Sequence, residues 1–279
     1  MIVLRRRELP PRLRAIHDPP ERLYLRGAAS PELLAQPSVA VVGARACSPY
    51  GTQVARMLGR ELARAGLVVI SGLARGIDGE AHRGSLDAGG NTIAVLGCGI
   101  DRDYPAAHGT LASAIAERSL LVSEYEPGVE PAPWRFPARN RIIAGLAAAT
   151  IVVEARERSG ALITADLALE EGREVFTVPG EITSSLSAGT NALLKLGATP
   201  LTCAEDVLAT LGIERAPACV PQLSGDAAAL LALVREAPAG ADELVRRSGL
   251  AADAVAAELV RLELEGLVVV ADGRYRPAG

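Results

Sequence analysis

The stretch VAVVGARACSPYGTQVARMLGRELARAGLVVIS, residues 39–71, decides the fold class of this chain. It begins with a short apolar run at 39–43, continues through helical spacing at 54–66, and ends in a second apolar run at 67–71. Both runs are apolar throughout, which is typical of strands that are buried on both faces of a parallel sheet. The stretch therefore predicts a strand–helix–strand unit.

The same alternation continues along the chain. Strands are predicted at 39–43, 67–71, 92–97, 120–124, 150–155 and 174–180, with helical segments between them. Repeated βα units of this kind predict an α/β fold, a Rossmann-like doubly wound parallel sheet. With 279 residues, 49% of them hydrophobic, the chain is long enough to bury a large core. Neither a membrane-spanning run nor a signal core is present, so we expect a cytoplasmic protein with no membrane partner.

The composition divides the chain into four segments. Residues 1–37, rich in proline and arginine, are predicted to form an N-terminal extension packed on the sheet domain, which spans 38–215. A proline-containing linker at 216–223 leads to 224–279, where three short helical segments precede two strand-like runs joined by a turn at Asp272-Gly273. This order predicts a small C-terminal winged-helix domain.

Ligands of doubly wound sheets bind at the carboxyl ends of the strands, which here carry glycine, serine, threonine and arginine. Arg45, after the first strand, is expected to contact a phosphate. Arg75, after the second, has two equally supported roles, a ligand contact or an ion pair with Asp78. Ser159 and Thr164 lie at the start of a predicted helix, where simple capping is as well supported as ligand binding.

Cofactor and catalytic motifs are missing from the strand ends. GARACSPYG is not the GxGxxG dinucleotide motif, and the pattern GxxxxGK[ST] is absent, so neither NAD nor ATP is expected as a cofactor. Four scattered cysteines and three isolated histidines predict neither a metal site nor disulfides. No histidine has an obvious nucleophile beside it, and no pair of carboxylates stands out. We therefore expect a binding protein without catalytic residues.

The segment WRFPARNRIIAGL, residues 134–146, concentrates arginines and aromatic rings in a chain whose net charge is -4. Phosphates require cations and unpaired bases require flat faces, and the adjacent Arg135 and Phe136 supply both. The segment thus favours a single-stranded nucleic acid as the ligand. Core packing is the alternative for Trp134 and Phe136, and Asn140 is expected to cap the start of the helix that follows.

Eight motifs carry a resemblance to a known family. In chain order they are VAVVGAR…SPYG, VVISGLARGIDGEAH, GGNTIAVLGCGIDRDYP, SEYEPG, FPARNRIIAGL, VVEARERSGALITA, GREVFTVPG and AGTNALLKLGA. Over residues 10–211 the chain resembles the DNA-processing protein A (DprA, or Smf) family, and its C-terminal segment resembles the winged helix that many members carry. The resemblance implies a homodimer that binds single-stranded DNA, protects incoming strands during natural transformation, and loads the RecA recombinase onto them.

The resemblance also implies DNA contacts at the strand ends. The predicted DNA-binding set, in which Arg135 rests on its chemistry alone, is Gly43, Arg45, Ser71, Gly72, Arg75, Arg135, Phe136, Arg139, Asn140, Arg141, Ser159, Gly160 and Thr164. Ala106 and His108 stand where members often carry a basic residue and an asparagine, so a phosphate contact is expected to be missing there. Many members also begin with a helical domain, which this chain is expected to lack.

The predicted third helix of the winged-helix domain is acidic. It carries Asp253, Glu258, Glu263 and Glu265 against Arg261. Such a helix would repel phosphates, so we predict that this domain contacts protein and not DNA.

Two other functions fit parts of the sequence. One is a nucleotide-processing phosphoribohydrolase of the related Rossmann-like group, but the strand end SGALITADLALEEG lacks that group's PGGxGTxxE signature. The other is a transcription regulator that binds DNA through its winged helix, which the acidic third helix disfavours.

Overall fold

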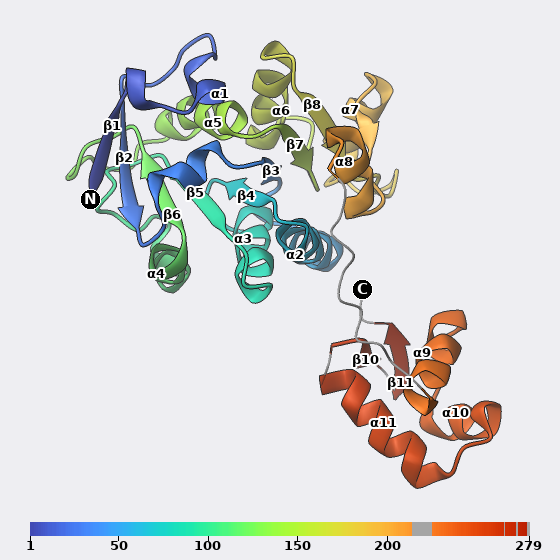
Figure 1. Ribbon diagram of the computed structural model, residues 1–279. Coiled ribbons are helices and arrows are strands. Elements are labelled where there is room, and N and C mark those ends of the chain that lie inside the picture. Colours follow the sequence, from blue (N-terminus) through green and yellow to red (C-terminus); the bar gives the residue numbers. More distant parts are fainter. Residues whose placement is uncertain (214–224, 265, 272, 278–279) are drawn as a thin grey trace. The chain divides into compact units, whose positions relative to one another are not determined.

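The structure is a computed structural model that describes residues 1–213, 225–264, 266–271 and 273–277. The chain forms two compact units, Met1–Arg215 and Ala216–Gly279 (Figure 1). The predicted linker at 216–223, together with Glu265 and the turn residue Asp272, lies outside the described residues.

The first unit is built on a sheet in which the described residues form nine strands, in the order β1-β2-β6-β5-β4-β3-β7-β8-β9. The strands are β1 (Ile2–Arg5), β2 (Arg22–Gly27), β3 (Ser38–Val42), β4 (Val68–Ser71), β5 (Thr92–Leu96), β6 (Leu120–Ser123), β7 (Ala149–Val152), β8 (Glu174–Thr177) and β9 (Thr199–Pro200). All neighbours from β6 to β9 are parallel. The six predicted strands are all present, and the mostly parallel α/β fold is confirmed.

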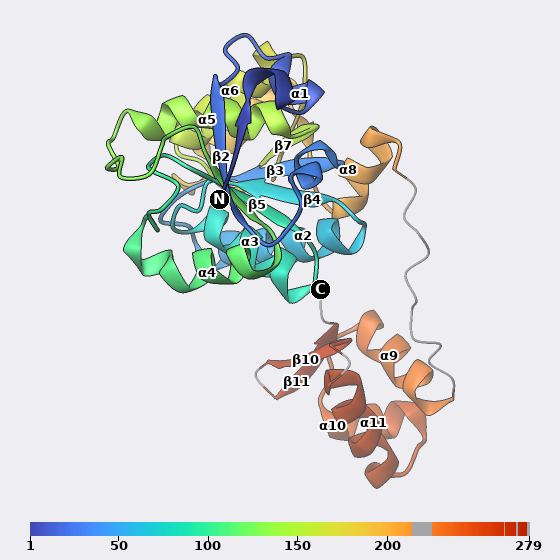
Figure 2. The ribbon, with the colours of Figure 1, turned by 60° about the vertical axis from the view of Figure 1, so that its left-hand side comes forward.

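Helices cover both faces of this sheet (Figure 2). One face carries α1 (Pro11–Arg14), α5 (Arg135–Leu146) and α6 (Gly160–Glu170), and the other carries α2 (Pro49–Arg64), α3 (Ile77–Asp87) and α4 (Gly109–Arg118). The remaining helices are α7 (Ala188–Lys195) and α8 (Ala204–Leu211), with short 3-10 helices at Arg6–Glu8, Pro31–Ala35 and Ala106–His108. Ile142, Ile143 and Leu146 of α5 are buried against the strands, as their spacing predicts.

The N-terminal segment does more than pack on the sheet. β2 pairs antiparallel with β6, and β1 pairs antiparallel with β2, so residues 1–37 extend the sheet at one edge. Leu23, Tyr24 and Leu25 of β2 are buried, whereas the flanking Arg22 and Arg26 are not. Three apolar residues among prolines and arginines are too short a pattern to distinguish a strand from a loop, which is why the sequence does not predict this pair.

The second unit consists of three helices and a hairpin. They are α9 (Asp226–Glu236), α10 (Ala241–Ser248), α11 (Ala252–Leu264), β10 (Val268–Ala271) and β11 (Arg274–Pro277). Leu230, Leu244, Leu259 and Val268 are fully buried in its own apolar core. β10 and β11 pair antiparallel, as expected for the wing of a winged helix.

The parallel topology decides where a ligand site can lie. The carboxyl ends of β3, β4, β5, β6 and β7 meet at one edge of the sheet, and α5 and α6 begin there. Within the described residues, no helix combines the length and apolarity that crossing a bilayer would take.

Candidate functional site

A pocket of about 220 Å³ lies where β3 and β4 end and α5 and α6 begin. It is lined by Val42, Gly43, Arg45, Ala74, Asp78, Phe136, Pro137, Arg139, Asn140, Ile143, Ser159, Gly160, Ala161 and Thr164. A second hollow of about 440 Å³ shares Arg45, Phe136 and Arg139 with it and extends to Gly72, Arg75 and Tyr104. Ten of the thirteen predicted site residues therefore line one continuous recess; Ser71, Arg135 and Arg141 do not.

Arg45, Phe136 and Tyr104 form a stacked column in the recess. The Arg45 guanidinium carbon lies 5.3 Å from the centre of the Phe136 ring, and the Phe136 and Tyr104 rings stack with centroids 5.3 Å apart and an interplanar angle of 23°. An added Cβ on Gly97 would come within 2.7 Å of the Phe136 ring, so the glycine at the end of β5 makes room for it. The column combines a cation with flat faces that can stack on a base.

Arg45 and Arg75 are exposed cations at this recess. Among the described residues, neither has a hydrogen-bond or ion-pair partner. The alternative role of Arg75, an ion pair with Asp78, is not realised, because Asp78 is buried and accepts hydrogen bonds from the backbone N–H groups of Gly72 (3.1 Å) and Ala74 (3.3 Å). Both arginines are therefore available to an anionic ligand.

Arg139 is a buried strut. Its Nη1 donates to the carbonyl oxygens of Gly72 (2.8 Å) and Val95, and its Nε donates to Asn140 (3.2 Å), so it joins the ends of β4 and β5 to α5. Burial lowers the pKa of Arg139 to about 10, and burial likewise raises the pKa of Asp78, an effect that the charge of Arg139 opposes. An added Cβ on Gly72 would lie 2.5 Å from the guanidinium, so Gly72 serves to admit Arg139.

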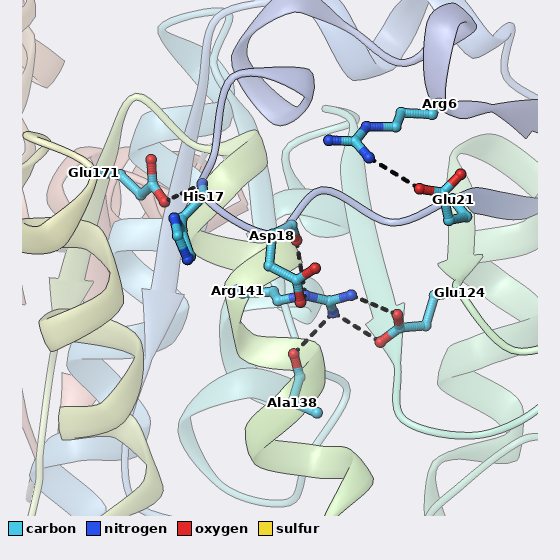
Figure 3. A network of polar contacts seen from close by, with 8 residues as sticks. All are labelled: Arg6, His17, Asp18, Glu21, Glu124, Ala138, Arg141 and Glu171. Atoms are coloured by element: carbon cyan, nitrogen blue, oxygen red, sulfur yellow. Dashed lines mark hydrogen bonds and ion pairs between the residues drawn. The ribbon is translucent and has the colours of Figure 1, made fainter.

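Arg141 lies in a different place and has a different role (Figure 3). Its Nη1 and Nη2 donate to both carboxylate oxygens of Glu124 (2.8 and 2.7 Å), and its Nε donates to the carboxylate and the carbonyl of Asp18 (2.9 Å each). Partial burial is the largest single effect on the pKa of Arg141 and lowers it. The carboxylates of Glu124 and Asp18 together outweigh burial, so the pKa of Arg141 is raised. Arg141 thus ties the N-terminal segment to β6 and α5. Arg141 lines neither pocket of the recess.

The start of α6 forms one wall of the pocket. Ser159 is its N-cap and accepts from the backbone N–H of Ala161 (3.3 Å), which is the capping role left open by the sequence. Thr164 is buried, and the carbonyl of Gly160 accepts from Asn140 Nδ2 (3.2 Å). Gly160 itself is exposed, and an added Cβ would meet nothing within 4 Å. The electropositive N-terminus of this helix is therefore open to an anion.

Asn140 does not have the role expected from the sequence. Helix α5 begins at Arg135 with Trp134 as its N-cap, so Asn140 lies in the second turn and cannot cap the start. It is buried and connects Arg139 with the carbonyl of Gly160, so it ties α5 to α6.

Gly43 and Ser71 have structural roles at the ends of β3 and β4. Ser71 is fully buried, and its hydroxyl donates to the carbonyl of Val41 (2.6 Å), which joins β4 to β3. An added Cβ on Gly43 would lie 2.6 Å from the side chain of Ile77 and 3.0 Å from the carbonyl oxygen of Glu154. Both positions are set by packing within the protein.

Arg135 belongs to a second aromatic cluster beside the recess. Its guanidinium lies 4.8 Å from the ring centre of Trp134 and 5.1 Å from that of Tyr125, and it donates to the carbonyl of Glu130. Trp134 is 63% exposed, so the core-packing alternative is wrong for this residue. Phe136 is half-buried, so its exposure alone does not decide between core packing and base stacking.

The two histidines near the site are buried structural groups. His82 Nδ1 bonds the Thr92 hydroxyl (2.7 Å), and burial lowers the pKa of His82 to about 3. His108 Nδ1 bonds the carbonyl of Leu73 (3.0 Å), whose φ of 58° is unusual for a leucine. The imidazole of His108 thus supports the loop that holds Arg75.

Tyr104 is the main site residue that the sequence analysis missed. It follows β5 in the motif GCGIDRDYP, is 42% exposed, and stacks on Phe136. Its position at the end of β5 was the available signal, but in the sequence it stands apart from the aromatic residues and arginines at 134–146.

Comparisons with known proteins agree with the motifs. The family described as DNA recombination-mediator protein A matches residues 1–212, and the family described as DprA winged helix domain matches residues 214–274. DNA processing protein DprA of Streptococcus pneumoniae is 48% identical over 197 residues, which are 71% of this chain and 69% of that protein. Protein Smf of Escherichia coli K12 is 41% identical over 281 residues, which cover 95% of this chain and 74% of that protein.

Two solved structures have the same fold. The X-ray structure of DprA from Streptococcus pneumoniae aligns with a TM-score of 0.72 and 46% identity, covering 75% of this chain and 73% of that one. A structure of DNA processing protein A from Helicobacter pylori, whose description concerns its single-stranded DNA binding mode, aligns with a TM-score of 0.68 and 33% identity, covering 75% of this chain and 94% of that one. The resemblance inferred from the eight motifs is confirmed.

Proposed function

Since this chain belongs to the DNA recombination-mediator protein A family, we propose that it binds single-stranded DNA in the recess at the carboxyl edge of its sheet. The observation that carries the proposal is the column of Arg45, Phe136 and Tyr104, with the unpaired Arg75 beside it. The single-stranded DNA binding named for the Helicobacter pylori relative, which shares the fold at 33% identity, supports it.

In this proposal the recess residues divide the work. Arg45, Arg75 and the N-terminus of α6 contact phosphates, which supplies affinity without regard to sequence. Tyr104, the 42% exposed end of the column, offers a ring face to an unpaired base, which a duplex cannot present, and Phe136 stacks behind it against Arg45. Arg139, Asn140 and Asp78 hold these groups in place from the buried side. A chain with a net charge of -4 thereby gathers its DNA-binding charge in one place.

Family membership supports a finer role as a proposal. We propose that the chain acts in the cytoplasm as a homodimer, protects incoming strands during natural transformation, and loads RecA onto them. RecA filament assembly on single strands coated with single-strand-binding protein tests the loading role, and sedimentation equilibrium tests the dimer. Faster assembly and twice the chain mass are expected; unchanged assembly or a monomer would refute the respective part.

We also propose that the chain is not an enzyme. Asp78, which lines the recess, and the histidines His82 and His108 are buried, and each bonds a neighbouring group of the fold. A phosphoribohydrolase activity, the alternative, would release free base from nucleoside monophosphates. Chromatography after prolonged incubation is expected to find none above the rate in a protein-free control, and release that depends on the protein would contradict this proposal.

The binding proposal is tested by titrating a fluorescent single-stranded oligonucleotide against wild type, Arg45→Ala and Arg75→Ala. Each variant should lower the affinity and reduce the slope of log affinity against log salt by about 0.7, the loss of one phosphate contact on a single strand. Arg64→Ala is the matched control, because Arg64 is an exposed arginine in the last turn of α2, remote from the recess. Preference for duplex, or equal binding by all four proteins, would sink the proposal.

A further inference from the structure

A second flat surface lies next to the recess. Trp134, the chain's only tryptophan, is the N-cap of α5 and is 63% exposed. Tryptophan is one of the most strongly buried residue types on average, so an indole left in water beside a ligand site calls for a physical reason.

The indole is held in position from one side. The Arg135 guanidinium lies between Trp134 and Tyr125, 4.8 and 5.1 Å from the two ring centres, and its hydrogen bond to the carbonyl of Glu130 fixes it to the loop after β6. Because these contacts already restrain Arg135, its side chain loses little conformational freedom when a ligand binds. The restrained guanidinium in turn orients the Trp134 ring. Trp134 is therefore an ordered platform.

The indole cannot share a base with Phe136. Both residues are helical, and side chains two positions apart on a helix project about 200° apart. Phe136 points to Arg45 and Tyr104 at the ends of β3 and β5, whereas Trp134 is associated with Arg135 and Tyr125 after β6. The two rings mark two successive places along an extended ligand.

From this arrangement we propose that Trp134 stacks on an unpaired base of the strand where it leaves the recess past the end of β6. The inference rests on the proposed single-stranded DNA binding and adds a subsite to it. The subsite contributes stacking and little charge, because Arg135 is held between the rings and Arg102, which reaches the same loop, is paired with Glu130 at 2.7 Å.

The sole tryptophan makes the test direct. An oligothymidylate of about 16 nucleotides, long enough for a typical single-strand site, is titrated into wild type, Trp134→Ala, Trp134→Phe and Leu169→Ala. Leu169 is a matched control, since it is 53% exposed and lies at the far end of α6. Binding is followed by the anisotropy of labelled DNA, and the indole is followed separately by its emission and its quenching by acrylamide with unlabelled DNA.

The subsite predicts that saturating DNA changes the tryptophan emission and protects it from acrylamide. Trp134→Ala should weaken binding about 5- to 150-fold with no change in the salt slope, Trp134→Phe should recover most of the loss, and Leu169→Ala should match wild type. DNA that binds wild type without altering the emission, with Trp134→Ala within about twofold of it, would overturn the subsite and leave the proposed function standing. A salt slope lowered by about 0.7 in Trp134→Ala would overturn stacking as the contact. No anisotropy change with any protein would overturn both.

Discussion

Replacing Arg139 by methionine separates a structural role from a DNA contact most clearly. The change keeps an unbranched side chain of similar length but removes the donors to Gly72, Val95 and Asn140. Two buried carbonyl oxygens and one amide oxygen then lack a partner, and Asp78 loses the main charge that opposes its burial. Unsatisfied buried groups of this kind cost about 1–3 kcal/mol each, and some will be rehydrated through the pocket. We expect Arg139→Met to lower the free energy of unfolding by about 3–5 kcal/mol at neutral pH.

The pH dependence identifies Asp78 as the source of part of this loss. Burial raises the pKa of Asp78 in the folded protein, so between its unfolded value and that raised value the folded state binds more protons than the unfolded chain. The free energy of unfolding therefore falls as the pH rises through this range. Without Arg139 the pKa rises further, and the range extends to higher pH. Arg139→Met should consequently be less destabilised near pH 5 than near pH 8.

Urea unfolding of the first unit (Met1–Arg215), followed at both pH values, measures these effects, with Asp78→Asn as the partner variant. The asparagine can still accept from the N–H groups of Gly72 and Ala74 but carries no charge. The double variant should therefore be more stable than Arg139→Met alone near pH 8. A loss below about 1 kcal/mol, or the absence of any rescue, would refute the strut, since an exposed phosphate-binding arginine would behave in that way.

Three further predictions concern other parts of the chain. Gly160→Ala should leave the free energy of unfolding unchanged or raise it by up to about 1 kcal/mol, because the added Cβ meets no protein atom. The same variant should weaken single-strand affinity, because the new methyl group narrows the approach to the N-terminus of α6, and equal affinity would contradict an anion site there. Arg141→Ala should lower the free energy of unfolding by about 2 kcal/mol and expose residues 1–27 to protease while leaving the DNA salt slope unchanged, and a reduced slope would restore Arg141 as a phosphate contact. Deleting residues 222–279 should leave single-strand affinity within tenfold in the same anisotropy assay; a larger loss would show that the winged helix binds DNA despite its acidic third helix.

The central strands were predictable and the edge strands were not, for one physical reason. β3 to β8 are almost entirely buried and mostly apolar, so their pattern is clear in the sequence. β1 is largely exposed and β2 has only three buried residues, and their pairing depends on β6, which lies about a hundred residues away in sequence. The residues around β1 and β2 therefore carry no information about the strand with which β2 pairs.

The same limit applies to the site. The motifs identified the strand ends that form the recess, but they could not show which arginines face the ligand. Arg139 and Arg141 are two positions apart on α5, so they project in nearly opposite directions: one enters the space that Gly72 leaves, and the other reaches Asp18 and Glu124. Those partners come from three distant segments, and the roles of the two arginines follow from them.

Photocrosslinking with an oligonucleotide that carries 5-iodouracil tests the central claim most directly, because the excited base forms adducts with aromatic side chains on which it stacks. After irradiation and digestion, mass spectrometry should find the adduct on Phe136 or Tyr104, and Arg45→Ala should reduce its yield in step with the lost binding. Adducts confined to the second unit, or adducts in the first unit that avoid both the recess and Trp134, would contradict the account.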